Sequence, residues 1–151
     1  MDNLASVFIT VLSGVLVYVL SQLFTEFVLR PIQEYKKLKG KVAKELVFYA
    51  HYYSNPQKIG TAQDFPAWKA AGEAMRELAS EVSAFAEIKP LHPFVFYAIP
   101  TKKRLLDAAR YLMGMSNDFF ISGDEHSRER LSYPEIIKEN MGITHKKRKK
   151  K

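Results

Sequence analysis

Residues 3–25 read NLASVFITVLSGVLVYVLSQLFT, a run of 23 residues without a charge. At about 1.5 Å of rise per residue, a helix of this length crosses a hydrocarbon core of about 30 Å. Apolar side chains occur on every side of such a helix, which is typical of lipid contact, whereas a surface helix carries a single apolar stripe. The sequence therefore predicts a transmembrane helix over residues 3–29.

A cleaved signal peptide is the main alternative to a permanent span. It requires a positively charged segment before the apolar run, but Asp2 is the only charged residue before Glu26. The run is also long for the apolar part of a signal peptide. We therefore expect the span to be retained.

Basic residues follow the span but do not precede it. Six of them lie between Arg30 and Lys44, with Glu34 as the one acidic residue in that interval. Because lysine and arginine collect on the cytoplasmic side of membrane proteins, we expect a short N-terminus outside and the C-terminal domain in the cytoplasm. Glu26 lies one helical turn before Arg30, and we expect these two side chains to pair at the membrane interface.

One side of the predicted span carries small and weakly polar residues at steps of three and four. They are Ser6, Thr10, Ser13, Gly14, Val17 and Ser21. Small residues let helix backbones approach closely, and hydroxyls can bond across the contact, so this stripe is a candidate for self-association or for docking on another membrane protein. The alternative is that the hydroxyls bond to carbonyls of their own helix.

The rest of the chain has helical spacing and no convincing alternating strand pattern. After a kink or restart at Pro31, residues 30–54 form a basic, amphipathic juxtamembrane helix, the first helix of a bundle. Residues 55–142 form the remainder of the helical domain, and residues 143–151 form a disordered polybasic tail. The predicted fold is therefore all-α, with one N-terminal transmembrane helix followed by an antiparallel helical bundle.

Caps and breaks set the expected bounds of the later helices. One is capped by Asp64 and ends before Lys89, a second is capped by Thr101 and stops near Gly123, and a short one covers residues 134–140. The expected inward face of the juxtamembrane helix is Ile32, Tyr35, Leu38, Val42, Leu46, Tyr49 and Tyr53. That of the helix ending before Lys89 is Trp68, Ala71, Met75, Leu78, Val82 and Phe85. That of the helix capped by Thr101 is Leu105, Ala108 or Ala109, Leu112, Met115 and Phe119.

The net charge of +7 belongs to two segments and not to the folded domain. Residues 146–151 are all basic and residues 30–44 carry a net +5, whereas residues 45–145 carry a net −2. We expect these two segments to lie against anionic lipid headgroups, and nucleic acid is not an expected partner. The basic residues concerned are Arg30, Lys36, Lys37, Lys41, Lys44, Lys146, Lys147, Arg148, Lys149, Lys150 and Lys151. For the tail, attraction to RNA or DNA, a dilysine retrieval signal and a cloning remnant stay open as alternatives.

Two further patterns have alternative interpretations. Glu73, Glu77 and Glu81 form a like-charge row that facing lysines could offset, but we favour two solvated rows because exposed pairs contribute little. Residues 91–99 form an apolar run that is either a buried plug between two helices or a segment in the membrane interface.

No motif for catalysis or metal binding is present. Cysteine is absent and the four histidines stand far apart, each without a second ligand at metal spacing. There is also no glycine-rich phosphate loop and no nucleophile elbow. We therefore expect no enzyme activity and no cofactor. A weaker alternative is a hydrolase or ligand sensor with a pocket near Tyr49, Tyr53 and Phe94.

Four segments carry a resemblance to known proteins. They are RPIQE at 30–34, FYAHYYSNP at 48–56, ELASE at 77–81 and AARYLMGMSN at 108–117. They resemble a group of bacterial single-pass membrane proteins with a cytoplasmic helical domain and a P-I-x-E…F-Y-A…Y-S-N-P motif, a group without an assigned activity. The resemblance implies the bacterial inner membrane and transfers no catalytic residue.

Two functional hypotheses follow from the sequence. The first is a membrane-anchored interaction module that self-associates or docks a partner at the cytoplasmic face of the membrane. The second is a small membrane-perturbing effector whose spans oligomerise in the bilayer. Leakage of ions or dye on expression would distinguish the effector from the interaction module.

Overall fold

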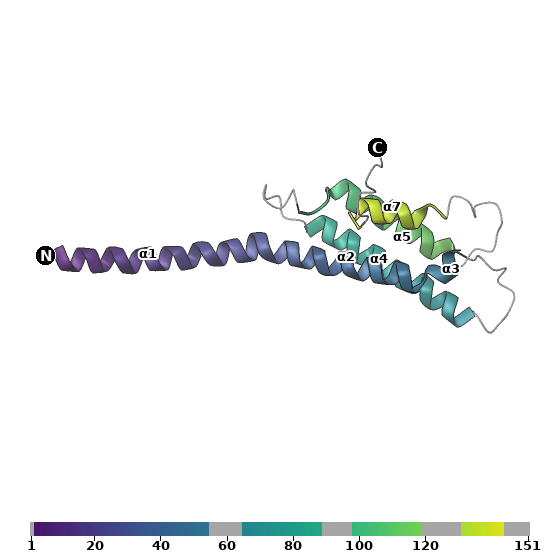
Figure 1. The fold of residues 1–151 in the computed structure, drawn as a ribbon, viewed down its shortest axis with the longest axis horizontal. Helices are drawn as coiled ribbons and strands as arrows, with labels where there is room; N and C mark the ends of the chain where they lie inside the picture. Colours follow the sequence, from purple (N-terminus) through teal and green to yellow (C-terminus); the bar gives the residue numbers. More distant parts are fainter. Residues whose placement is uncertain (1, 55–64, 89–97, 119–130, 144–151) are drawn as a thin grey trace, which may run out of the picture.

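The computed structural model describes residues 2–54, 65–88, 98–118 and 131–143, and these residues contain helices and no strand. The helices are α1 (Asp2–Phe24), the π-helical turn η1 (Thr25–Leu29), α2 (Arg30–Phe48), α3 (Ala50–Ser54), α4 (Phe65–Ile88), α5 (Lys102–Asp118) and α7 (Tyr133–Asn140). Figure 1 shows α4, α5 and α7 packed along α2, while α1 projects from one end of the bundle. The predicted all-α fold, with one long apolar helix followed by a helical bundle, is confirmed.

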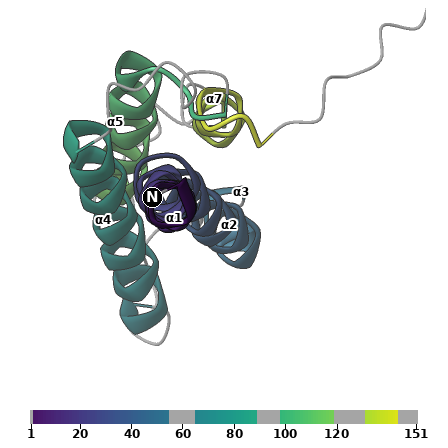
Figure 2. The same ribbon diagram turned by 90° about the vertical axis from the view of Figure 1, so that its left-hand side faces the viewer.

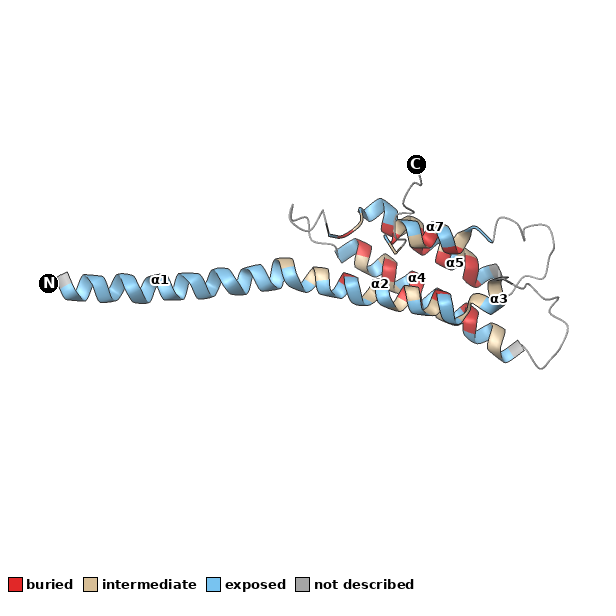
Figure 3. Ribbon diagram, viewed as in Figure 1, coloured by how far each residue is buried: buried red, intermediate tan, exposed pale blue. Residues whose placement is uncertain are grey.

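The N-terminal helix is exposed along its whole apolar part. Every residue from 3 to 27 is exposed, and Figure 3 shows α1 without a buried residue. The continuous helix Asn3–Phe48 is long enough and apolar enough to cross a membrane. Viewed along α1 in Figure 2, α4 and α5 lie on one side of this long helix and α7 on another.

The long helix continues through Pro31, so the restart that was one expectation for this position does not occur. Proline lacks an N–H, and its ring crowds the carbonyl four residues earlier. Just before Pro31 the helix widens into η1, where the N–H of Arg30 donates to the carbonyl of Thr25 five residues back. A π-helical turn of this kind absorbs a local misfit without ending the helix. The apolar helix and the first helix of the bundle are therefore continuous.

The hydrophobic core lies between α2, α4, α5 and α7. The most extensive packing is between α4 and α5, and α7 packs on α5. All expected inward residues that the structure describes are buried or packed against the core, and Ala79 and Ala86 extend the face of α4. The buried apolar residues are Tyr35, Val42, Leu46, Ala71, Met75, Leu78, Ala79, Val82, Ala86, Ile99, Leu105, Ala108, Ala109, Leu112, Met115, Ile137 and Met141.

Some helix ends differ from the expected ones. The helix expected to run to residue 54 is interrupted at Tyr49, whose backbone angles (φ −93°, ψ 12°) leave the helical region, so that α3 is a separate short helix. The Thr101 cap is present, since its hydroxyl accepts the N–H of Arg104 at 3.4 Å. The expected cap Asp64, the stop near Gly123 and the tail at 144–151 lie outside the described residues.

The end of α7 is a Schellman motif built on a glycine. Gly142 has φ +59°, a conformation that residues with a Cβ rarely adopt. Its N–H donates to the carbonyl of Glu139 at 3.0 Å, and the N–H of Ile143 donates to that of Lys138 at 2.7 Å. These two bonds satisfy carbonyls that the end of a helix leaves open. The helix therefore ends close to Gly142, as its sequence predicts.

Candidate functional site

The hydroxyls of the α1 stripe already have hydrogen-bond partners. Each donates to a backbone carbonyl three or four residues back, over 2.8–3.3 Å; the donors are Ser6, Thr10, Ser13 and Ser21. Val17 supplies one of the accepting carbonyls. These hydroxyls do not need a second helix. The stripe can still contribute to helix association through its small side chains, which allow a second helix to approach closely. This applies above all at Gly14, where an added Cβ would meet nothing within 4 Å.

A row of alternating charges lies where the apolar run ends. Glu26, Arg30 and Glu34 follow at four-residue steps along η1 and α2. Arg30 Nη1 lies 2.6 Å from Glu26 Oε2, and Arg30 Nε lies 3.6 Å from Glu34 Oε1. The expected pair of Glu26 with Arg30 is present, and Glu34 adds a second carboxylate to it. We call these three residues the charged row.

A cleft of about 260 Å³ lies between the charged row and the C-terminal end of α4. Phe27 and Pro31 line it beside the row, and Phe85 and Ile88 line it from α4. Ile88 is 79% exposed and Phe27 is 49% exposed, so apolar side chains surround the opening of the cleft. We call this feature the junction cleft, because it lies where the exposed helix meets the bundle.

The lysines of α2 divide into two groups. Lys36 and Lys37 are exposed and have no partner within the described part of the chain. Lys41 instead reaches α4, where its Nζ lies 2.5 Å from Glu81 and 3.3 Å from Glu77. The hydrogen bond with Glu81 raises the pKa of Lys41. The interpretation of two separately solvated rows is therefore wrong at Lys41, which offsets the repulsion between these two glutamates.

Two other lysines form ion pairs, one within its own helix and one between two helices. Lys44 Nζ lies 3.2 Å from Glu45 of the same helix. Lys102, at the start of α5, lies 2.5 Å from Glu87 and does not pair with the glutamate row at 73–81. The basic residues 146–151 lie outside the described residues. Of the basic residues expected at the membrane surface, Arg30, Lys36 and Lys37 are the described ones nearest to the apolar helix.

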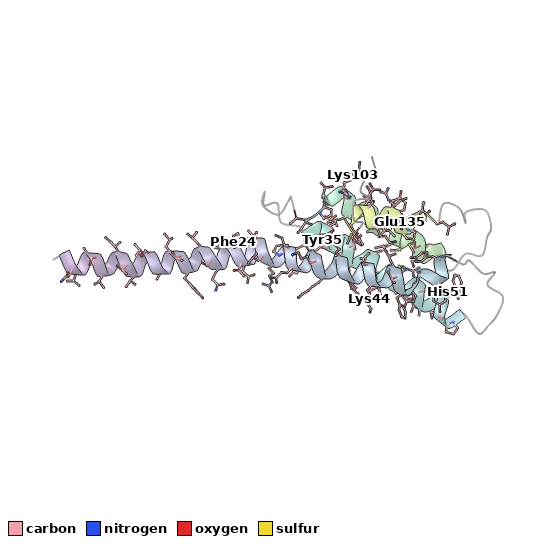
Figure 4. All side chains as sticks on the ribbon, in the orientation of Figure 1. Phe24, Tyr35, Lys44, His51, Lys103 and Glu135 are labelled. Carbon is pink, nitrogen blue, oxygen red and sulfur yellow. The ribbon has the colours of Figure 1, made fainter. Side chains whose placement is uncertain are left out.

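Three side chains donate to backbone carbonyls at the C-terminal end of α7. Tyr35 of α2 donates to Met141, and Lys39 of the same helix donates to Gly142. Arg104 of α5 donates to Glu139. The last carbonyls of a helix lack intrahelical partners and carry its negative dipole end, so donors and cations are favoured there. The Tyr35 bond is buried and 2.5 Å long, and burial raises the pKa of Tyr35 to about 12. Figure 4 shows Tyr35 on the side of α2 that faces the bundle.

Aromatic rings gather at the end of the bundle farthest from α1. The ring centroids of Tyr49 and Tyr52 are 6.1 Å apart, and those of Tyr52 and Trp68 are 5.5 Å apart, edge to face. Beside them Val47 is 73% exposed and Phe48 is 68% exposed. We call Val47 and Phe48 the distal patch. Figure 4 labels His51 at the same end of the bundle.

The pocket expected near Tyr49, Tyr53 and Phe94 is not assembled by the described residues. Tyr49 and Tyr53 both pack against the core. The hydroxyl of Tyr53 donates to the carbonyl of Leu46 at 2.7 Å, which ties α3 to α2. Phe94 lies outside the described residues, as do residues 91–97 of the predicted plug. Ile99, the last residue of that run, is buried in the core.

No catalytic or metal centre emerges from the described residues. Within them, no three His, Cys, Asp or Glu side chains lie close enough together to hold a metal ion. Comparisons of the chain with protein-family models, with curated proteins and with solved structures found no match. The candidate functional features are therefore the α1 stripe, the junction cleft and the distal patch. Sequence spacing indicates the first of these, but the cleft requires Phe85 and Ile88, which only the packing of α4 brings to the charged row.

Proposed function

We propose that the chain is a single-pass, membrane-anchored interaction module without enzyme activity. One observation supports this above all: a single helix, Asn3–Phe48, is exposed on all sides in its apolar half and contributes to the core in its other half. A long apolar helix that no protein element covers is stable in lipid and not in water. The proposed topology puts the domain in the cytoplasm, because Arg30, Lys36 and Lys37 follow the span, and the proposed membrane is the inner membrane of the cell.

The distal patch is the surface that we propose for a protein partner. Phe48 lies 18 residues beyond Arg30, which corresponds to about 27 Å along a helix. The patch is therefore too far from the membrane surface to contact headgroups while α2 stands upright. Exposed aromatic side chains over a packed aromatic layer are typical of the centres of protein interfaces. The partner would be a protein with a complementary apolar surface on the cytoplasmic side.

Self-association would use the α1 stripe. Because the stripe hydroxyls bond within their own helix, the contact between two spans would depend on close backbone approach at Gly14 and not on hydroxyl bonds between helices. Two copies joined in this way would carry two distal patches. The module would then act as a dimeric docking platform.

Anionic headgroups are the proposed lipid partners of the basic residues. Lys36 and Lys37 lie about 10 Å beyond Arg30 along the helix, within reach of the headgroup layer for long side chains. The tail residues 146–151 would add to this attraction, at about 1 kcal/mol or less for each cation near an anionic leaflet. Deleting the tail from the full chain should weaken its sedimentation with anionic vesicles, and unchanged sedimentation would remove the tail from the proposal.

The test is to extract the full-length chain in mild detergent, measure the mass of the complex by light scattering, and identify co-purified proteins. Gly14→Leu should reduce the dimer, whereas Ser13→Ala should leave it intact. Phe48→Lys should lose the partner, whereas Leu131→Lys, which alters an exposed leucine elsewhere, should retain it. A monomer without a partner would contradict the proposal. Growth arrest with membrane depolarisation on expression would instead favour the membrane-perturbing effector.

A further inference from the structure

We propose that the junction cleft binds the headgroup of a zwitterionic phospholipid that carries a primary amine, phosphatidylethanolamine. The proposal rests on the membrane anchoring proposed above, but it does not depend on a protein partner or on self-association. It assigns a ligand to a cleft that the charged row and the end of α4 form together.

The depth of the cleft in the membrane matches a headgroup. Residues 3–25 span about 34 Å as a helix, slightly more than a hydrocarbon core of about 30 Å. Glu26 and Arg30 therefore fall in the headgroup layer. Their side chains are 53% and 64% exposed, so that they are open to a ligand from that layer.

The order of charges matches a zwitterion. The row reads negative, positive, negative from Glu26 through Arg30 to Glu34, with the guanidinium between two carboxylates. A lipid phosphate can accept from the planar guanidinium, and a primary ammonium has N–H donors for a carboxylate. An anionic headgroup would satisfy the arginine but would be repelled by both carboxylates. A choline headgroup has the positive charge but no N–H donor.

The apolar part of the lining suits the region of the lipid next to the phosphate. Phe27 and Pro31 form one wall and Phe85 and Ile88 the other. A volume of about 260 Å³ is small for a whole ligand of drug size, which occupies about 300 Å³ or more. It can take a headgroup with part of the glycerol, while the acyl chains stay in the bilayer beside α1. The exposed Ile88 and Phe27 would then contact lipid.

The test uses the full-length chain in nanodiscs that contain equal amounts of phosphatidylethanolamine, phosphatidylcholine and phosphatidylglycerol. The protein is transferred to detergent, and the lipids that remain bound are identified by native mass spectrometry. We expect phosphatidylethanolamine to be retained about tenfold over phosphatidylcholine, the ratio that one charge-assisted hydrogen bond gives. The double variant Glu26→Gln with Glu34→Gln should lose this preference. Phosphatidylglycerol is the headgroup proposed for the basic residues outside the cleft, and its retention there is a separate readout.

Two further variants separate the site from its surroundings. Ile88→Trp should fill the cleft from the α4 side, which lowers retention of phosphatidylethanolamine and leaves that of phosphatidylglycerol unchanged. Because Ile88 is 79% exposed, the core is not disturbed. Glu73→Gln is the matched control: it removes an exposed carboxylate on α4, 3.8 Å from Lys69 and outside the residues that line the cleft, and it should change nothing.

Three results would overturn the proposal. They are equal retention of phosphatidylethanolamine and phosphatidylcholine, a fall in phosphatidylglycerol as large as that in phosphatidylethanolamine when Ile88→Trp fills the cleft, and a phosphatidylethanolamine preference that survives the double variant. Each leaves membrane anchoring intact. Absence of the full-length chain from the membrane fraction would instead refute the anchoring and the lipid site together, so the two failures are distinguishable.

Discussion

Replacing Tyr35 with phenylalanine removes a single oxygen atom from the contact that fixes the end of α7 against α2. The Tyr35 hydroxyl donates to the Met141 carbonyl at 2.5 Å, and both residues are buried, with exposures of 3% and 0%. The phenylalanine ring would keep the packing against Phe85, whose ring centroid lies 5.8 Å away. The substitution therefore leaves a buried carbonyl without this donor while it preserves the shape of the core.

The expected cost follows from that unsatisfied acceptor. Leaving one buried partner of a hydrogen bond unpaired costs about 1–3 kcal/mol. For a domain of this size, each kcal/mol lowers Tm by about 4 °C. Tyr35→Phe should therefore lower the free energy of unfolding by about 1–3 kcal/mol and Tm by about 4–12 °C.

Alkaline pH gives an independent check on the same contact. Burial raises the pKa of Tyr35 to about 12, whereas an unfolded tyrosine titrates near 10. The folded state thus holds the Tyr35 proton more tightly than the unfolded state does. The stability that this difference contributes is complete below pH 10 and is lost as the pH rises towards 12. The loss should be about 2 kcal/mol. The pKa of Lys41 is also raised, so its contribution to stability is likewise lost as the pH rises. The effect of Tyr35 is therefore the difference in stability between the wild type and Tyr35→Phe at each pH.

The assay is urea unfolding of the full-length chain in detergent, followed by circular dichroism at neutral pH and at a series of values from pH 9 to 12. Tyr111→Phe is the matched control, because the Tyr111 hydroxyl has no hydrogen-bond partner among the described residues. It should unfold like the wild type. If Tyr35→Phe also unfolds like the wild type, and its stability falls as steeply with alkaline pH, the role given to this hydroxyl is refuted.

The same unfolding assay tests four other positions. Gly142→Ala should lower the free energy of unfolding by about 1–2 kcal/mol, because φ at Gly142 is +59°. Gly40 lies in mid-helix with open space around it, so Gly40→Ala should raise the free energy of unfolding by up to about 1 kcal/mol. Equal effects of the two substitutions would contradict this. Ser116→Ala should stabilise by about 1 kcal/mol, since Ser116 Oγ is buried and has no partner among the described residues. A loss of stability would indicate a partner for it. Lys41→Met should lower stability slightly, and less in high salt; an effect independent of salt would argue against the pairing with Glu81.

Local patterns were sufficient to predict most of the fold. The spacing of Val42, Leu46, Met75 and Leu112 identified faces that are buried, because each helix must turn its apolar side inward. Gly142 marked the end of α7 because few residues other than glycine tolerate its conformation. The break at Tyr49 carried no such mark. It lies within a run of aromatic residues that also fits a continuous helix.

The candidate site was predicted less completely, because it depends on contacts between distant segments. The charged row is visible as a four-residue repeat, but a helix alone has no cleft until Phe85 and Ile88 are placed beside it. The pairing of Lys41 with Glu81 was considered and not favoured, since charge patterns do not reveal which helix faces which. The passage through Pro31 also differed from expectation. A single proline is consistent with either a break or a π-helical turn, and the sequence does not distinguish the two.

The unbroken passage through η1 links the angular position of the domain to that of the helix in the lipid. Each residue turns an α-helix by about 100° and advances it by about 1.5 Å. Inserting one residue into α1 would therefore rotate the bundle about its anchor by more than a quarter turn with almost no change in height. If two anchors associate through Gly14, the number of residues between Gly14 and Thr25 sets the direction in which each copy presents Phe48. The length of the anchor then determines which surfaces of two neighbouring domains can face each other.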